Sequence, residues 1–322
     1  DWQLEVDEAI ESAKQCELLA LDIDSQIVNS DGCNVSTYQF LCSYANSNGF
    51  NNSFKASRHS KSCILLAKDK EGLKRDYDYT TARDPNLLID NKTLAEQAVA
   101  KTLSRMNPQK LSSRTCPVIF SNEISSSLLG AFISAISGSS IYRRSSFLLD
   151  HIGKEIFPKR YNIQESPYDI GAFASSAYDG EGVQTRNNCF LEEGVLKQYV
   201  LGSYSARRLG LATTANAGGV HNLSINDDGC NQPELLDEMG TGLLVTSLMG
   251  SAVNMVTGDY SRGASGFWIE NGQIQYPVEE ITIASNFKDM FASIQMISND
   301  IDIRKSTKCG SILIPKMTIA GK

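Results

Sequence analysis

The sequence predicts an α+β protein of two domains: a mixed α/β N-terminal part with an antiparallel meander, then a β-rich C-terminal domain built from hairpins with few helices. The chain has 322 residues, which favours two domains over one. In the first half, short segments rich in Val, Thr, Tyr and Phe alternate with turn residues. Beyond Leu149 the sequence is strand-like and punctuated by glycine almost to its end. We expect domains 1–114 and 115–322.

The first domain is expected to contain two helices around a meander. Residues 7–21 repeat apolar side chains at helical spacing, with Asp7 as the N-cap. From Ser25 to Arg83 the strands are expected to be separated by Asp31-Gly32, Ser47-Asn48-Gly49 and Lys70-Glu71-Gly72. A second helix, marked by apolar positions from Leu94 to Met106, is closed by Asn107-Pro108.

The second domain is expected to open with a strand and a helix. Residues 116–120 read as a buried strand, and a helix from about Asn122 to Ser137 stops at Gly138. Further helices are expected around Gln232–Met239 and Asn286–Phe291. Asn271-Gly272, between alternating apolar and polar residues, predicts a tight hairpin.

The composition excludes several classes of protein. Hydrophobic residues make up 41% of the chain and charged residues 21%, which is ordinary for a soluble globular protein. The net charge of −7, with scattered basic residues, argues against non-specific nucleic-acid binding. Apolar runs such as 128–136 are too short to cross a membrane. Eight cysteines without a CxxC pair indicate a reduced, cytoplasmic setting, and the start at Asp1 without Met suggests a fragment.

The residues alone do not define a self-contained active site. The three histidines, His59, His151 and His221, include no pair spaced for one helix face, and each is expected to be structural, with His59 at the surface. Cys309 with His221 could form a dyad, but an incidental buried Cys is the simpler interpretation. No Gly-x-Ser-x-Gly elbow or phosphate-binding loop occurs.

The segment Thr257–Trp268 is the most distinctive part of the chain. It places three glycines among Asp259, Tyr260 and Arg262, directly before the expected hairpin. One interpretation is a glycine-rich hairpin with bulges. The other is a wall formed by Asp259, Tyr260, Arg262 and Trp268 that holds an extended peptide by strand addition.

This segment resembles the PmbA (TldE) branch of the TldD/PmbA metallopeptidase family, whose full-length members carry a further region ahead of Asp1. Other stretches of the chain match the family in the same order and make the resemblance specific. They are Tyr178–Val183, Ser203–Gly210, Ala217–Asn222, Met239–Thr246 and Pro277–Ile283.

In TldD-type subunits, a His-Glu-x-x-x-His helix and a later Cys before Gly are implied to bind zinc, with the glutamate as general base. Carried onto this chain, the histidine positions hold Asn122 and Ser127, the glutamate is Glu123, and Cys309-Gly310 matches the cysteine. Asn and Ser are poor zinc ligands beside one thiolate. Glu123 is either a relic of the motif or an ordinary first-turn helix residue, and Cys309 is expected to be structural.

The resemblance implies a cytoplasmic metalloprotease complex of two related subunits acting on unfolded or extended peptides. Zinc would sit in the TldD-type partner, and this chain would shape the cavity. No membrane or nucleic acid is implied, and a homodimer is possible in isolation. Two rival hypotheses are a non-enzymatic peptide-binding scaffold and an independent hydrolase that uses Cys309.

Overall fold

The computed structural model describes residues 2–70, 72–250 and 252–321. The chain divides into two compact units, Asp1–Pro108 and Gln109–Lys322. This division falls before Arg114 because the chain already joins the second unit at Gln109, whose amide donates to the carbonyl of Pro277 at 2.8 Å. Within the described residues no helix is long and apolar enough to span a bilayer.

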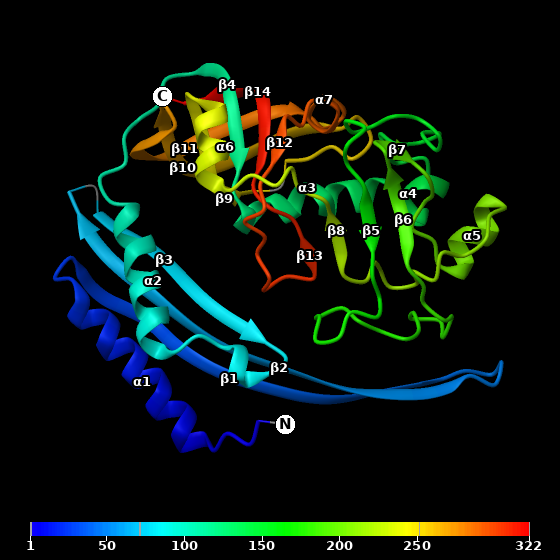
Figure 1. The fold of residues 1–322 in the computed structure, drawn as a ribbon, viewed down its shortest axis with the longest axis horizontal. Coiled ribbons are helices and arrows are strands. Elements are labelled where there is room, and N and C mark those ends of the chain that lie inside the picture. Colours follow the sequence, from blue (N-terminus) through cyan, green and yellow to red (C-terminus); the bar gives the residue numbers. More distant parts are fainter. Residues whose placement is uncertain (1, 71, 251, 322) are drawn as a thin grey trace. The chain divides into compact units, whose positions relative to one another are not determined.

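The first unit is an antiparallel sheet with two helices on one face (Figure 1). The strands β1 (Ile27–Ala45), β2 (Asn51–Asp69) and β3 (Gly72–Ala82) follow one another in space, which confirms the predicted meander. The helices are α1 (Val6–Ile23) and α2 (Asn91–Ser104), with a 3-10 turn, η1 (Pro85–Leu87), ahead of α2. Alternate residues Cys63, Leu65 and Ala67 of β2 are buried with apolar residues of both helices.

Two local predictions in the first unit are wrong. Helix α1 is capped by Glu5, not Asp7. The backbone amide of Glu5 donates a hydrogen bond to the Glu8 carboxylate at 3.4 Å. Asp31-Gly32 does not separate two strands, because a bulge at Gly32 (φ 108°) lets β1 run through it. Glu71 of the expected Lys70-Glu71-Gly72 turn lies outside the described residues.

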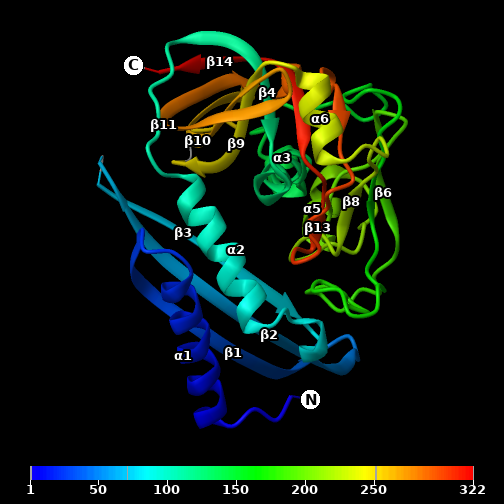
Figure 2. The same ribbon diagram turned by 60° about the vertical axis from the view of Figure 1, so that its left-hand side comes forward.

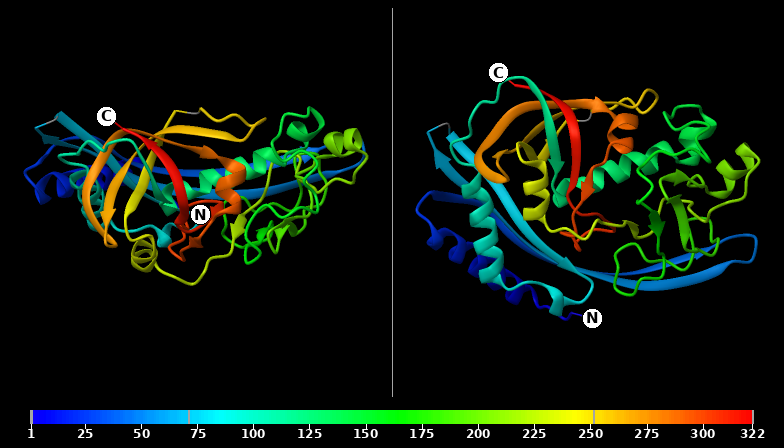
Figure 3. Two further views of the ribbon diagram at one scale, coloured as in Figure 1. Left: turned by 90° about the horizontal axis from the view of Figure 1, so that it is seen from above. Right: turned by 45° about the horizontal axis from the view of Figure 1, so that its top comes forward.

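The second unit is built on a six-stranded sheet in the order β11-β10-β9-β4-β14-β12. Strand β11 also pairs with β14, so five of the strands close into a ring (Figure 3). The strands are β4 (Arg114–Phe120), β9 (Gly242–Met249), β10 (Asp259–Glu270), β11 (Gln273–Asn286), β12 (Met296–Ile297) and β14 (Ile312–Ala320). The Asn271-Gly272 hairpin is confirmed, with φ of 51° and 73° at its two central residues.

Helices cover both faces of this sheet (Figure 2). Val118 and Phe120 of β4 join the large core that includes α3 (Asn122–Ala135), whereas Ile119 between them contacts the core under α6 (Gln232–Met239). The expected helix over 232–239 is confirmed, and α7 (Phe287–Ala292) lies where another was expected. The helix expected to stop at Gly138 ends at Ala135, and a separate helix α4 (Gly138–Tyr142) begins at Gly138.

A smaller five-stranded sheet has the order β13-β8-β5-β6-β7. Its strands are β5 (Ile163–Glu165), β6 (Asn188–Glu192), β7 (Val195–Leu196), β8 (Leu223–Ile225) and β13 (Thr307–Lys308), with α5 (Ser203–Leu209) nearby. The expected strand-like character beyond Leu149 does not hold for residues 166–187, which form turns and irregular backbone with one isolated bridge. There the Asp179 carboxylate accepts hydrogen bonds from three backbone amides at 2.9 to 3.0 Å. A side chain thus provides the acceptors that a neighbouring strand would provide in a sheet.

Candidate functional site

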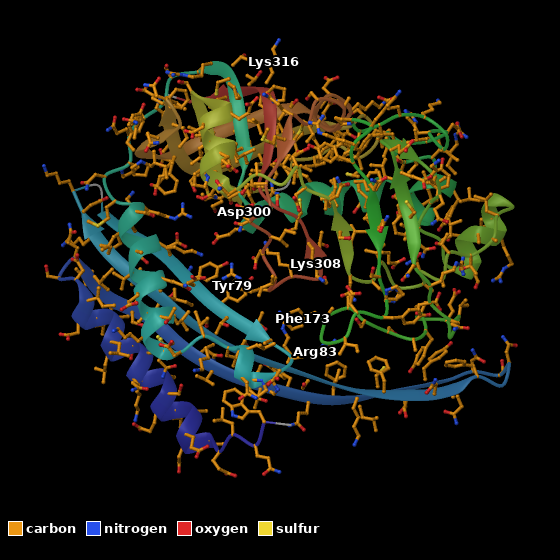
Figure 4. All side chains as sticks on the ribbon, viewed as in Figure 1. Tyr79, Arg83, Phe173, Asp300, Lys308 and Lys316 are labelled. Carbon is orange, nitrogen blue, oxygen red and sulfur yellow. The ribbon has the colours of Figure 1, made fainter. Side chains whose placement is uncertain are left out.

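The start of α3 is held by the loop between β12 and β14, which carries Asp300 (Figure 4). The side-chain amide of Asn122 donates to the carbonyl of Asp300 at 2.5 Å, and the backbone amide of Asn122 donates to Ser311 Oγ at 2.9 Å. The Asp300 carboxylate in turn accepts the Ser311 amide and hydroxyl, both at 2.7 Å. The Asn122 side chain, which the resemblance equates with the family's first histidine, is therefore engaged in fixing this loop.

Cys309 and Ser127 do not face each other. Cys309 is 1% exposed, and burial raises the pKa of its thiol to about 12. The α3 side chain that reaches toward it is Ser125, whose Oγ lies 3.5 Å from the Cys309 carbonyl oxygen, whereas Ser127 is exposed. A thiol this buried behaves as a small apolar side chain.

Two basic residues lie beside Glu123. The Lys305 ammonium donates to the Glu123 backbone carbonyl, and Arg304 Nη2 is 4.0 Å from the Glu123 carboxylate. Both bases also contact buried Asp302, at 2.7 Å from Arg304 Nε and 3.7 Å from Lys305 Nζ. Burial opposes ionisation of Asp302, but the bonds and charges of Arg304 and Lys305 outweigh it and lower the pKa of this carboxyl.

The histidines have structural surroundings. His59 is fully buried, so its expected surface position is wrong: Nδ1 is 2.7 Å from Thr37 Oγ1, and burial lowers its pKa. His151 Nδ1 lies 2.7 Å from the Leu149 carbonyl oxygen. His221 Nδ1 lies 2.9 Å from the Glu165 carboxylate, not beside a thiol, which leaves the Cys309–His221 dyad without support from the geometry.

The four residues expected to form a peptide wall divide between core and surface. Tyr260 and Trp268 are 3% and 4% exposed and belong to the large core, so neither can contact a bound peptide. Asp259 is exposed but bonded to Thr257 and Asn286, and Arg262 is partly buried. Strand β10 pairs with β11 along its length and with β9 from Gly263 to Ile269, so that part of it has no free edge for strand addition.

A pocket of about 580 Å³ gathers three of the stretches that carry the family resemblance. Its lining includes Glu181, Tyr204 and the 216–219 segment, together with serines at the start of α4. The Glu181 carboxylate accepts the Ser203 amide at 2.8 Å, which fixes the start of α5 at the pocket. The individual motifs were visible in the sequence, but their convergence on one pocket was not, because it depends on long-range packing.

The comparisons with known proteins identify the family. Residues 113–321 match the PmbA/TldA metallopeptidase C-terminal domain, and residues 1–106 match the central domain. Metalloprotease PmbA of Escherichia coli O157:H7 is 46% identical over 316 residues, which cover 98% of this chain and 70% of that protein.

Solved structures agree in fold. A protein from Bacteroides thetaiotaomicron, described as a candidate modulator of DNA gyrase, superposes with a TM-score of 0.93 at 28% identity, covering 99% of this chain and 72% of that one. TldE from Thermococcus kodakarensis gives a TM-score of 0.84 at 21% identity, covering 99% and 75%. The α+β fold and the family resemblance are both confirmed: the chain is a PmbA-type member of the PmbA/TldD metallopeptidase family.

Proposed function

We propose that this chain is the subunit without catalytic zinc in a cytoplasmic two-subunit peptidase, and that a TldD-type partner supplies the zinc for cleaving unfolded or extended peptides. The observation that carries the proposal is the chemistry at the family's ligand positions. Asn122 is bonded to the Asp300 carbonyl, Ser127 is exposed, and Cys309 is enclosed in the core. These groups do not fit a zinc ion, which needs three converging N, S or carboxylate ligands.

The charges around Glu123 support the same conclusion. Lys305 and Arg304 bring two positive charges to the start of α3, where a metalloenzyme would place its cation. A metal ion would be a third cation at this place and would be repelled by the two bases, whose charges Glu123 and Asp302 already balance. No catalytic step is therefore assigned to Glu123.

The exposed end of the first unit's sheet is suited to contact the partner subunit. Strand β3 pairs with β2 only from His59 to Asp69. Residues 51–58 of β2 therefore pair only with residues 38–45 of β1 and form a two-stranded ribbon. Tyr38, Phe40 and Leu41 on this ribbon are 63%, 48% and 62% exposed. Two-stranded ribbons are marginally stable alone in water, and a partner that covers the exposed apolar side chains of this ribbon would stabilise it.

Peptide contact is assigned to the pocket beside α5. Serine hydroxyls and the 216–219 backbone offer hydrogen bonds, and Tyr204 supplies an aromatic surface that is 57% exposed. Groups of this kind can bind the main chain of a peptide with little regard to its sequence. This assignment replaces the wall on β10, whose Tyr260 and Trp268 are in the core.

The test is reconstitution with a TldD-type subunit. We expect cleavage of an unstructured, dye-labelled peptide only when both subunits are present. Leu41→Asp should abolish co-purification with the partner, whereas Leu73→Asp, at a site of matching exposure (61%), should not. Tyr204→Ala should raise KM while leaving assembly intact.

The same assay separates the rival functions. If the partner alone cleaves the peptide at the full rate, this chain is a non-enzymatic scaffold. If this chain cleaves the peptide alone and Cys309→Ser abolishes that activity, it is an independent hydrolase and the proposal is wrong.

A further inference from the structure

Three cysteines that are far apart in the sequence meet in the first unit. Cys16 lies on α1, Cys33 on β1 and Cys63 on β2, and their sulfur atoms are all within 4.8 Å of one another. In the part of the chain that the structure describes, no other His, Cys, Asp or Glu side chains form such a group of three. This cluster is separate from the family's ligand positions, which all belong to the second unit.

Strand register creates the cluster. Cys33 is the direct cross-strand partner of Cys63, and the pairing register shifts by one residue between Ser30 and Gly32. Without that shift Cys33 would be opposite Ser62. Because side chains alternate between the two faces of a strand, the bulge at Gly32 is what aligns Cys33 with Cys63 on the helix-covered face.

The cluster is enclosed on one side and open on the other. Cys16 and Cys63 are 3% and 0% exposed, packed with apolar residues of α1 and α2, whereas Cys33 is only partly buried. An ion can therefore reach the three sulfurs from the Cys33 side. Lys61, two residues before Cys63, places its charge near Cys16 and bonds the Asn91 side chain at 3.0 Å.

We propose that Cys16, Cys33 and Cys63 bind a single soft metal ion through their three sulfur atoms. Thiolates select thiophilic ions such as Zn²⁺ and Cu(I). With metal–sulfur bonds of about 2.3 Å, three sulfurs on a tetrahedral ion are about 3.8 Å apart, so a small inward movement completes the site. Three thiolates, Zn²⁺ and the Lys61 ammonium sum to zero charge, which favours Zn²⁺ over Cu(I), with water as a fourth ligand at the open side.

Metals bind cysteine as the thiolate, so a bound ion would take the place of the three thiol protons. A disulfide, by contrast, joins only two sulfurs at about 2.05 Å and leaves the third unused.

The first test uses the whole chain, reduced and kept free of oxygen, titrated with Cd²⁺ as the probe. We expect a sulfur-to-metal charge-transfer band that saturates at about one equivalent and is lost in Cys33→Ser. Cys42→Ser, also on β1 but exposed, and Cys309→Ser should both keep the band. A wild-type chain without the band, or a Cys33→Ser variant that keeps it, overturns the proposal.

A second test needs no variant and so does not depend on the folding of Cys33→Ser. Thiol alkylation of the wild-type chain is followed by peptide mass spectrometry, with and without metal. Metal should slow alkylation of Cys33 by about tenfold or more and leave exposed Cys42 unchanged. Separate arms with Zn²⁺ and with Cu(I) identify the ion. Equal labelling of Cys33 in all arms, or a disulfide within the cluster under reducing conditions, rejects the site.

Discussion

Replacing Gly310 by alanine should disrupt the loop that fixes the start of α3. A Cβ at this position would lie 1.6 Å from the Ser298 carbonyl oxygen and 2.6 Å from its carbonyl carbon. Real Cβ contacts are longer than 3.0 Å, so the Ser298 backbone must retreat by more than an ångström. The obstacle is main chain, which cannot rotate away as a side chain can.

The displacement breaks bonds that can be named. The Ser298 amide donates to the Ser311 carbonyl at 2.9 Å, and the Ser311 amide donates to the Asp300 carboxylate at 2.7 Å. A buried neutral bond contributes about 1 kcal/mol and a bond to a charged group about 2, so Gly310→Ala should cost about 3 kcal/mol of unfolding free energy. Asn122 should lose its bond to Asp300 as well.

The assay is urea unfolding followed by tryptophan fluorescence in a Trp2→Phe background. Of the two tryptophans, only buried Trp268 then reports, and it lies in the second unit. The control is Gly130→Ala on α3, where a Cβ meets nothing within 4 Å and should stabilise the helix by about 0.5 to 1 kcal/mol. Equal midpoints for Gly310→Ala and wild type would refute the reasoning.

Three further predictions concern buried polar groups. Tyr260→Phe should leave unfolding free energy unchanged or raise it by up to about 1 kcal/mol in urea unfolding, because the buried hydroxyl has no partner among the described residues; a large loss would contradict this. Glu165→Gln should cost about 2 to 4 kcal/mol in the same assay, because the buried carboxylate accepts from Asn188, Asn216 and His221 and an amide nitrogen cannot; Glu155→Gln, which removes the same charge at an exposed position, is the control. Because the pKa of Asp302 is lower in the folded protein than in the unfolded chain, its ionised carboxylate stabilises the fold at pH values above the unfolded-state pKa near 4. This contribution is lost as the pH falls through the folded-state pKa, so the difference in unfolding free energy between wild type and Asp302→Asn should shrink in acid unfolding scans.

Local signals in the sequence were reliable where one segment determines its own structure. Asn271-Gly272 produced the expected hairpin, and the 232–239 helix begins with Asn231 and Glu234 in a reciprocal cap. One purely local prediction was displaced, since α1 is capped by Glu5 and not by Asp7. The other failures concern burial and strand pairing. Tyr260 was expected to line a peptide-binding wall, but packing within the second unit buries it, and Asp31-Gly32 was expected to be a turn because a bulge uses the same residues.

The candidate sites follow the same distinction. The proposal that Asn122 and Ser127 stand in place of zinc ligands rests on residue identity, whereas the meeting of Cys16, Cys33 and Cys63 was not visible in the sequence, since it requires a helix and two strands in one register. Metal content alone therefore cannot test the proposed function, because a zinc ion bound to this chain would fit either the cysteine cluster or a catalytic site. Metal lost with Cys33→Ser but kept with Cys309→Ser supports the cluster and leaves catalysis with the partner. Metal lost with Cys309→Ser but kept with Cys33→Ser would place the ion at the family position, and both proposals would then fail for separate reasons.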